Sequence, residues 1–517
     1  MLLCGWFASN AWAADPSTRD LPLAQDSVPQ AERTGLQLTF GGEYRIRAFN
    51  VENYFDARSA GGCGTPAGSC DDQERFLDQR FRLTTSVAAG ATTGVVTLDF
   101  LNTFAGTRAP SSLTGPGGGG TGDDRFGAGG LGGSRNAVGV REVYLRIDTK
   151  RGTLFAGRHR IVLGHGIVFD DVADGFTVMV PVRLTTLSLS ALNLVDDDAA
   201  PLAGDADLYL GHAEWRPNSA HNLSVYAGVL RDSGPALLNG LIYSLVDDNG
   251  TPQVTNPDLS PASGTVLLFG MAYDARVGPS TFNFEFDLLR GFIENVPFDA
   301  GTQEQVPLSG FNLLASQHVD LGAATVGMTM VYVSGSGPDD FGEVGGGATG
   351  VNLTAISPNF VLGNILSNGE HVSDRDGSTL NMGGFRGGIN QGGAGLFAIK
   401  LSAGGEVRPG VFVDGAVSYA KTVDPVIPTI NPADPAFCPA VLPGLPVGPP
   451  PNCEVDDRLG WELDLNARWQ VDDNLQFSAA AGVLIGDNAF SGLYNNDFTS
   501  LDTDPITKLV LRVIYRF

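Results

Sequence analysis

The sequence carries little charge, and most of that charge is negative. Only 17% of its 517 residues are charged, whereas soluble domains carry roughly 25%. Lysine is scarce, with four examples at Lys150, Lys400, Lys421 and Lys508. The 57 acidic residues outnumber the 32 basic ones and give a net charge of −25. An acidic chain repels phosphate backbones, so we expect no nucleic-acid partner.

Long hydrophobic runs are also missing. No segment approaches the ~18 consecutive apolar residues that a membrane-spanning helix needs, although 43% of the residues are hydrophobic. That hydrophobic share is too high for a disordered chain. Glycine, with 69 residues, has roughly twice its usual share of ~7%. The composition therefore excludes both a helical membrane bundle and a disordered polymer.

The N-terminus resembles a secretory signal, although a basic first region is absent. The apolar run Leu2–Phe7 is followed by Ala11-Trp12-Ala13, an A-x-A cleavage pattern. We therefore predict a signal peptide over residues 1–13 and a periplasmic linker over residues 14–35. The alternative is an apolar terminus with no targeting role.

Cysteine usage agrees with an oxidising compartment. Cys4 lies in the predicted signal, and the other four form two local pairs, Cys63 with Cys70 and Cys438 with Cys453. Four cysteines allow three pairings, of which the nearest-neighbour pairing closes short loops. We expect two loop disulfides there. No histidine lies near either pair at zinc-finger spacing, so we expect no metal site.

Alternation with period two is the dominant pattern of the chain. In residues 36–49, for example, Leu38, Phe40 and Ile46 fall on one face, while Arg45 and Arg47 fall on the other. Such alternation predicts half-buried strands. The pattern recurs in seventeen segments: 36–49, 76–89, 94–104, 138–149, 153–163, 183–194, 207–216, 221–231, 265–275, 280–290, 309–321, 324–334, 395–407, 410–421, 458–470, 474–485 and 507–517.

One further strand is required. Single-chain bacterial barrels have an even number of strands, and the parity of the segments breaks between 153–163 and 207–216. Gly175–Val180 also alternates, and we predict it as the missing strand, with Pro181 making the next turn. The count becomes eighteen, with nine outer loops.

Two features favour a membrane barrel over a soluble sandwich. Tight turns alternate with long polar connections, and Trp461 and Trp469 lie at strand ends, where aromatic girdles occur. We therefore predict an all-β fold over residues 36–517: a transmembrane antiparallel up-and-down β-barrel of about 18 strands with short periplasmic turns and long extracellular loops. Its location would be the outer membrane of a Gram-negative cell.

The predicted loops are rich in glycine, proline and acidic residues. Acidic clusters occur at Asp196–Asp198, Asp247–Asn249 and Asp339–Asp340. These clusters are typical of solvated surface that bridges to lipopolysaccharide through divalent cations. A dedicated Ca²⁺ site is the alternative, but no EF-hand spacing supports it.

Several segments resemble known outer-membrane proteins. Phe517, with Tyr515 and Val513 at two-residue steps, resembles the terminal strand that the barrel assembly machinery recognises. Leu154–His159, followed by Gly164, resembles the Gly-Arg-Gln strand of the alginate export family, with His159 in place of Gln.

Further segments resemble the same family. Gly460–Leu465, Asn474-Leu475 and Gly486–Phe490 resemble its penultimate hairpin, and Tyr332–Gly335 resembles its Tyr-Ala-Ser-Gly strand end. The resemblance implies an eighteen-stranded barrel with a conducting or secreting pore. It also implies acidic polysaccharide as a cargo, because the alginate exporter has an arginine-rich constriction.

The lumen-facing side chains would carry the function of such a pore. Strand parity predicts a cluster of inward-facing arginines: Arg45, Arg47, Arg80, Arg82, Arg146, Arg158, Arg160 and Arg512. It predicts an acidic wall on later strands: Glu285, Asp287, Glu462 and Asp464. Rings of arginine favour anions. Alternatively, each arginine pairs with a neighbouring acid and only braces the wall.

We therefore predict a passive channel, without cofactor, that passes or exports anionic solutes. A general, weakly selective porin is the first alternative. An outer-membrane lipid hydrolase is another, although no G-x-S-x-G motif lies near an inward histidine. A protein that binds ligands through its long loops is the last. Transport direction and oligomeric state stay open.

Overall fold

A computed structural model describes most of the barrel wall and parts of its connections. The described residues are 35–52, 74–106, 139–195, 206–233, 263–298, 301–335, 351–352, 361–366, 395–423, 457–487 and 505–517. The predicted signal and linker lie almost entirely outside these ranges, as do all five cysteines and the three acidic clusters. Those predictions therefore stay predictions.

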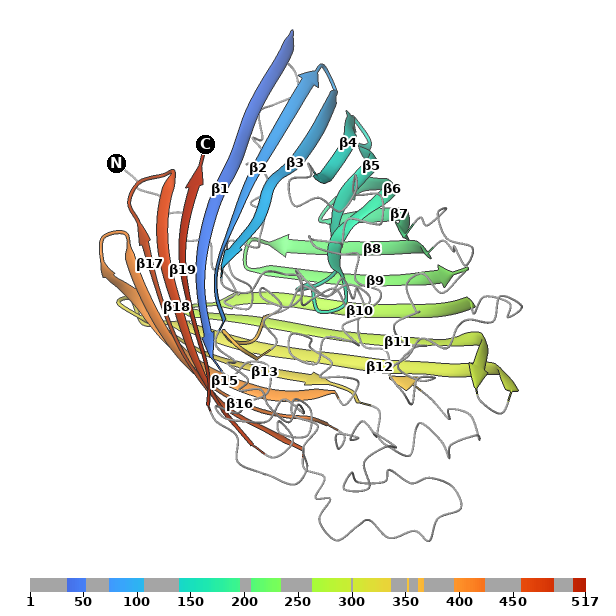
Figure 1. Cartoon of the computed structure of the whole chain (residues 1–517). Coiled ribbons are helices and arrows are strands. Elements are labelled where there is room, and N and C mark those ends of the chain that lie inside the picture. Colours follow the sequence, from blue (N-terminus) through green and yellow to red (C-terminus); the bar gives the residue numbers. More distant parts are fainter. Residues whose placement is uncertain are drawn as a thin grey trace, which may run out of the picture.

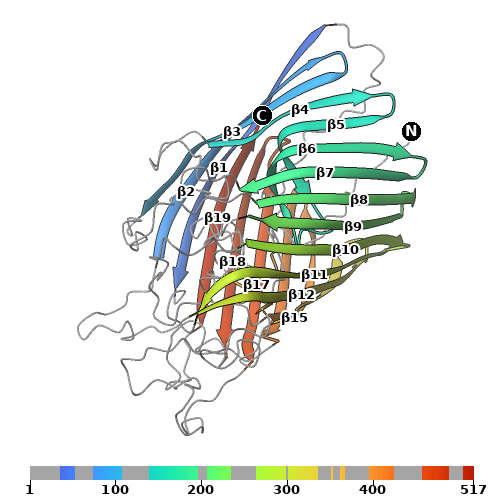
Figure 2. The same cartoon turned by 90° about the vertical axis from the view of Figure 1, so that its right-hand side faces the viewer.

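All strands belong to one closed antiparallel sheet (Figures 1 and 2). Each long strand pairs with its neighbours in the sequence, and β19 pairs with β1 to close the sheet. One of the nineteen strands, β14, is only two residues long, and it pairs in parallel with β12. Eighteen long strands remain, as the alternation predicts. No helix in the described residues is long and apolar enough to cross a membrane.

The strand bounds extend most predicted segments by a few residues. The strands are β1 Leu36–Glu52, β2 Glu74–Ala89, β3 Thr92–Gly106, β4 Gly139–Thr149, β5 Gly152–Val162, β6 Asp170–Val182, β7 Thr185–Val195, β8 Ala206–Asn218, β9 His221–Asp232, β10 Ser263–Val277, β11 Ser280–Phe298, β12 Gly301–Asp320, β13 Thr325–Val333, β14 Val351–Asn352, β15 Leu396–Arg408, β16 Val411–Lys421, β17 Arg458–Gln470, β18 Leu475–Gly486 and β19 Ile506–Arg516.

The inserted strand is present, but its turn differs from the prediction. β6 contains Gly175–Val180 and runs on through Pro181, which lies opposite Thr186 of β7. The turn is formed by Arg183 and Leu184 instead, and Arg183 adopts a φ of 56°. Proline at the end of a strand is tolerated because no ladder hydrogen bond is needed there.

Tight turns join the strands at one end of the barrel, and most connections at the other end are longer. β1 begins and β19 ends at the end that carries the tight turns (Figure 1). Short turns face the periplasm in outer-membrane barrels, so we refer to the two ends as the turn side and the loop side.

The exterior of the wall is apolar. Leu463 and Leu465 are 50% and 57% exposed, whereas Asp464 between them is buried inside. Trp461 and Trp469 are exposed at the two ends of the same strand, β17. A closed sheet leaves no unpaired edge, and an apolar outer face suits lipid. The chain therefore forms an outer-membrane β-barrel, as predicted.

The interior departs from the simple expectation of a charged lumen face. Toward the turn side, inward positions carry arginine, histidine and acids. Toward the loop side, two buried apolar clusters line the inner wall. One includes Leu208, Leu230 and Ile293, and the other includes Val51 and Leu484. Period two by itself does not show whether an inner face is polar or packed with apolar side chains.

The apolar exterior makes a stability prediction. Leu463→Arg should lower the free energy of unfolding by about 2–4 kcal/mol, the range for arginine at the bilayer midplane, whereas Leu36→Arg at the turn-side start of β1 should cost only about 0–1 kcal/mol. Guanidinium titration of the barrel folded in phospholipid vesicles measures both. Equal losses for the two variants would contradict the assigned lipid-facing band.

Candidate functional site

The seam where β19, β1 and β2 close the barrel gathers arginines on its inner face. Arg47 lies directly opposite Arg512, and Arg45 lies directly opposite Arg80. Arg45 and Arg47 are only 4% and 2% exposed. The seam therefore gathers positive charge from three strands, and we call these four residues the arginine seam.

Acidic residues brace part of this region. Glu43 accepts a hydrogen bond from Arg80 at 2.8 Å, and its other oxygen lies 3.5 Å from Arg516. Arg82 donates to both oxygens of Asp99 at 2.6 and 2.8 Å. Such bidentate pairs hold a planar guanidinium in one orientation. Arg82 is thus a strut, the role that the second interpretation of the arginines predicts.

Arg146 faces the lumen beside an aromatic group. Its guanidinium lies 6.0 Å from the ring centre of Phe155 and 3.1 Å from Asp148. Phe155 stacks on His159 at 5.7 Å, and Tyr144 meets His159 edge-on. His159 is buried and lies 2.8 Å from the hydroxyl of Thr177.

The same packing turns Arg158 and Arg160 away from the lumen, contrary to the sequence-based prediction. Arg158 lies opposite Val143, which is 46% exposed on the outer face, and donates to Asp174 at 2.8 Å. Arg160 shares this face and pairs with Asp170 at 2.7 Å. The sequence-based prediction chose the wrong face of β5 as the lumen face. Because β5 carries apolar residues on both faces, the two-residue alternation does not distinguish inside from outside.

The four predicted acidic residues all face inward, and all are buried. Glu285, Asp287 and Glu462 are 0% exposed, and Asp464 is 7% exposed. A buried carboxylate is stable only when hydrogen-bond donors or cations surround it. Two segments of the loop-side connections fold into the barrel and supply those donors, and sequence reasoning did not foresee either.

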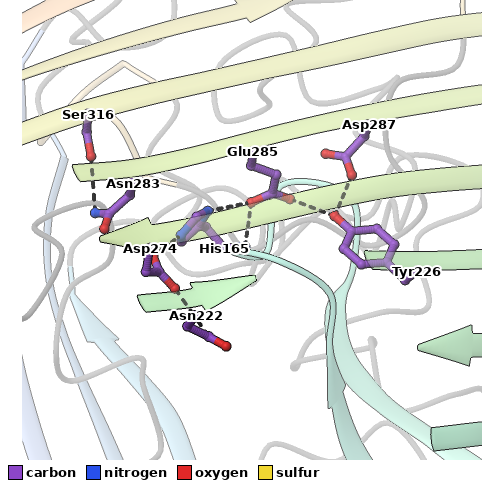
Figure 3. A network of polar contacts seen from close by, with 8 residues as sticks. All are labelled: His165, Asn222, Tyr226, Asp274, Asn283, Glu285, Asp287 and Ser316. Carbon is purple, nitrogen blue, oxygen red and sulfur yellow. Dashed lines mark hydrogen bonds and ion pairs between the residues drawn. The ribbon is translucent and has the colours of Figure 1, made fainter. Parts of the chain in front are cut away.

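Residues 163–169, between β5 and β6, form the first infolded segment. The backbone N–H of His165 donates to Glu285 Oε2. Its two ring nitrogens lie 2.9 Å from Glu285 Oε2 and 2.8 Å from Asp274 Oδ1 (Figure 3). Gly164, with a φ of 55°, leaves room for the carboxylate, because a Cβ there would lie 2.5 Å from the Glu285 side chain.

His165 supplies the positive charge of this contact. Burial by itself would lower its pKa, but the hydrogen bonds and negative charges of Asp274 and Glu285 outweigh burial and raise the pKa to about 9. The imidazole is therefore doubly protonated at neutral pH and donates to both carboxylates.

The contact continues along the wall through Tyr226 of β9. Its hydroxyl lies 2.5 Å from Asp287 Oδ1 and 3.2 Å from Glu285 Oε1 (Figure 3). The ring occupies the space over Gly270, where any Cβ would overlap it. The first segment is thus held by one connected polar network that spans three neighbouring strands.

Residues 361–366 form the second infolded segment, which docks on β17. The backbone N–H groups of Ile365 and Leu366 donate to the two oxygens of Glu462 at 2.6 and 2.9 Å. The N–H of Asn364 donates to Asp464 at 3.2 Å. Three consecutive backbone donors therefore hold one acidic pair, as in the anion-binding nests that successive N–H groups form.

The two segments share one recognition pattern. Each contains Leu-Gly followed by a polar residue, and each faces a Glu-x-Asp pair on the inner wall. Gly363 lies against Glu462 as Gly164 lies against Glu285: a Cβ on Gly363 would overlap the carboxylate. The polar residue then binds the wall, because Asn364 donates through its side chain to Asn466 at 3.1 Å. This shared pattern is the signal that sequence reasoning could have used.

Apolar packing completes the docking. Leu163, Val168 and Phe169 belong to one buried cluster of the inner wall. Ile167 belongs to the other buried cluster, which also contains apolar residues of the second segment: Leu362, Ile365 and Leu366. Each segment therefore combines a charged anchor with buried apolar side chains and narrows the lumen.

One serine–histidine contact bears on the hydrolase alternative. His212 Nε2 lies 2.6 Å from Ser224 Oγ on the neighbouring strand. In the part of the chain that the structure describes, no carboxylate is hydrogen-bonded to His212, and no three histidine, cysteine or acidic residues are placed to share a metal ion. The third group of a catalytic triad is thus not among the described contacts.

Comparison with known proteins finds likeness in fold only. No family model matches the sequence, and no characterised protein matches it. Among solved structures, OccK9 (OpdG) of Pseudomonas aeruginosa is 12% identical with a TM-score of 0.47, and the match covers 93% of this chain and 98% of that one. OccK8 (OprE) of the same organism is 10% identical with a TM-score of 0.46 and the same two coverages. No residue role is carried over from either.

The first segment should loosen with rising pH. Because the pKa of His165 lies above its usual 6.5, at about 9, the charged contact is complete below pH 6.5 and is lost as pH rises through about 9. The measured quantity is the amide hydrogen-exchange rate of residues 163–169 divided by that of residues 361–366, and this ratio should rise through this pH range. The second segment contains no histidine, so dividing by its rate removes the general increase of amide exchange with pH. His165→Gln should abolish the rise, and a flat ratio in the unmodified protein would refute the contact.

Proposed function

We propose that this barrel is an outer-membrane channel that passes anionic solutes. The observation that carries the proposal is the arginine seam, in which Arg47 faces Arg512 and Arg45 faces Arg80 across adjoining strands. Arginine keeps its charge at physiological pH and binds carboxylates and phosphates with two parallel hydrogen bonds. Arginines gathered on one stretch of a lumen wall favour anions over cations.

The acidic wall supports this proposal because its charge is already bound. Glu462 accepts two backbone hydrogen bonds from the second segment. Glu285 faces the imidazolium of His165. Donors and cations at contact distance compensate a carboxylate, so these acids oppose a passing anion less than open carboxylates would. The arginines of the seam then meet less opposing charge from the far wall.

The mechanism follows from size and placement. An eighteen-strand barrel encloses an aqueous lumen unless chain segments fill it, and the two infolded segments fill part of it. Arg45, Arg47 and Arg512 are all nearly buried and act through their field. Arg146, farther along the wall, adds a further cation. Arg146, whose side chain is 33% exposed, can contact a solute directly and replace part of its hydration, and no cofactor is needed.

The arginine seam supports a negative charge on the cargo and leaves its size open. Acidic polysaccharide, as in the alginate export family, is supported only by the sequence resemblance. Small organic anions fit the same seam. A general porin with little selectivity is the alternative, and it would share the wall and the two segments.

A lipid hydrolase is a weaker candidate on physical grounds. Ser224 and His212 face the lumen, whereas the acyl chains of a membrane lipid contact the outer face, so hydrolysis of lipid gains little from their contact. Hydrolysis of phospholipid by the purified protein, lost in Ser224→Ala, would support it. The remaining alternative, a protein that binds ligands through its long loops, depends mainly on residues outside the described ranges and stays a prediction.

Reversal potentials under a salt gradient test the anion preference. The double variant Arg47→Ala/Arg512→Ala should lower the anion-to-cation permeability ratio, by about fivefold for each charge if it acts at ~4 Å through water. Arg158→Ala, on the outer face, is the matched control and should leave the ratio unchanged. A pore of the unmodified protein that prefers cations would overturn the proposal, and a ratio near one would favour the general porin.

Single-channel conductance tests the constriction. Gly363→Ala places a Cβ against the Glu462 carboxylate, which two backbone donors hold in place. The second segment should be displaced and the mean conductance should rise. Gly139→Ala is the control, because nothing lies within 4 Å of its Cβ position. Equal conductance in the two variants would show that residues 361–366 do not limit the pore.

A further inference from the structure

Two arginines lie on the lipid-facing surface of the barrel. Arg231 is near the loop-side end of β9, opposite Thr265 of β10. Arg290 lies on β11, opposite Leu267, whose side chain is 56% exposed on the outer face. Both arginine side chains are exposed. The pleat of the sheet therefore directs both outward, toward lipid.

Neither arginine has a protein partner in the described part of the chain. No ion pair or side-chain hydrogen bond involves Arg231 or Arg290 there, although Asp207 lies directly across from Arg231. Asp207 instead accepts a hydrogen bond from Asn193 at 3.4 Å. By contrast, Arg158 on the same outer face is paired with Asp174. The two cations are therefore available for an external anion.

Their level along the wall matches the outer-leaflet headgroups. On β11 the outward residues from the turn side up to Arg290 are aromatic or aliphatic: Phe282, Phe284, Phe286 and Leu288. Arg290 lies near the loop-side end of this row, and the outward positions after it are Phe292 and Glu294. Tyr209, 50% exposed on β8 and diagonal to Arg231, is an aromatic residue of the kind enriched at membrane interfaces. Arginine on the lipid face is tolerated far better near the interface than at the bilayer midplane.

The spacing suits a phosphorylated headgroup. Arg231, Thr265 and Phe292 lie in line across three strands, and Arg290 is two residues from Phe292. With strands about 4.8 Å apart and a rise of about 3.4 Å per residue, the two arginine Cα atoms lie roughly 12 Å apart. Long arginine side chains can converge over that distance. Ser309, exposed opposite Arg290, adds a hydroxyl donor.

We propose that Arg231, Arg290 and Ser309 bind the phosphate of an outer-leaflet lipid. A lipid phosphate and free inorganic phosphate would present the same anion to these residues. The site lies at the edge of an apolar wall, however, and there the acyl chains of a lipid would also pack against the exposed Leu267 and Phe269. Basic groups at a membrane surface each raise the affinity for anionic headgroups about fivefold. This site does not depend on the channel function.

Binding of bisphosphorylated lipid A to the barrel in nanodiscs tests the site. Arg231→Ala/Arg290→Ala should weaken binding by roughly 25-fold, the product of two fivefold losses. Arg276→Ala, an exposed arginine at the turn-side end of β10, should bind like the unmodified protein. Arg231→Lys/Arg290→Lys should restore part of the affinity, because it restores the charge, and so separates charge loss from misfolding.

Three results would overturn the proposal. One is unchanged binding in the double alanine variant. Another is equal binding of dephosphorylated lipid A, which would assign the affinity to the acyl chains alone. The third is competition by inorganic phosphate at the same concentration as lipid A, which would make this a site for the free anion rather than for a lipid.

Discussion

The pairing of β1 with β19 is the constraint on which the rest of the molecule depends. In a bilayer, a backbone N–H or C=O without a partner costs several kcal/mol, so a membrane sheet must leave no open edge. The pairing runs from Glu43 opposite Arg516 to Glu52 opposite Thr507. It also brings Arg47 and Arg512 together from opposite ends of the chain. The same closure that satisfies the backbone thus creates the arginine seam.

Inside the wall, carboxylates and free backbone donors satisfy one another. A connection that folds inward carries N–H groups with no strand partner, and these need acceptors. The Glu-x-Asp pairs on β11 and β17 need donors once water is excluded. Docking residues 163–169 on Glu285 and residues 361–366 on Glu462 meets both needs. The interior acids therefore serve mainly to hold the two infolded segments in place.

The strand pattern was largely predictable because residues on the outer face contact lipid and are therefore mostly apolar. Outward positions through the membrane are mostly apolar, so period two persists through strands as different as β11 and β17. Parity even located β6 at Gly175–Val180. The inner face obeys no single rule. On β5, Phe155 points inward and stacks on His159, whereas Arg158 points outward and pairs with Asp174. This is the reverse of the expected arrangement, in which apolar residues face outward and charged residues face inward. Loop-side residues such as Leu208 and Val51 are buried inside for packing.

Local alternation was enough to predict the class of fold, the number of strands and most lipid-facing positions, because one solvent acts along the whole outer wall. Which inner charges meet could be learned only from the folded chain. Those contacts depend on strand register and on connections arriving from elsewhere in the sequence, such as His165 reaching Glu285 across several strands. The same Glu-x-Asp spacing could line an open pore or anchor a segment. The difference lies in whether backbone donors reach the carboxylates, and that is decided by where the fold places segments that are remote in sequence.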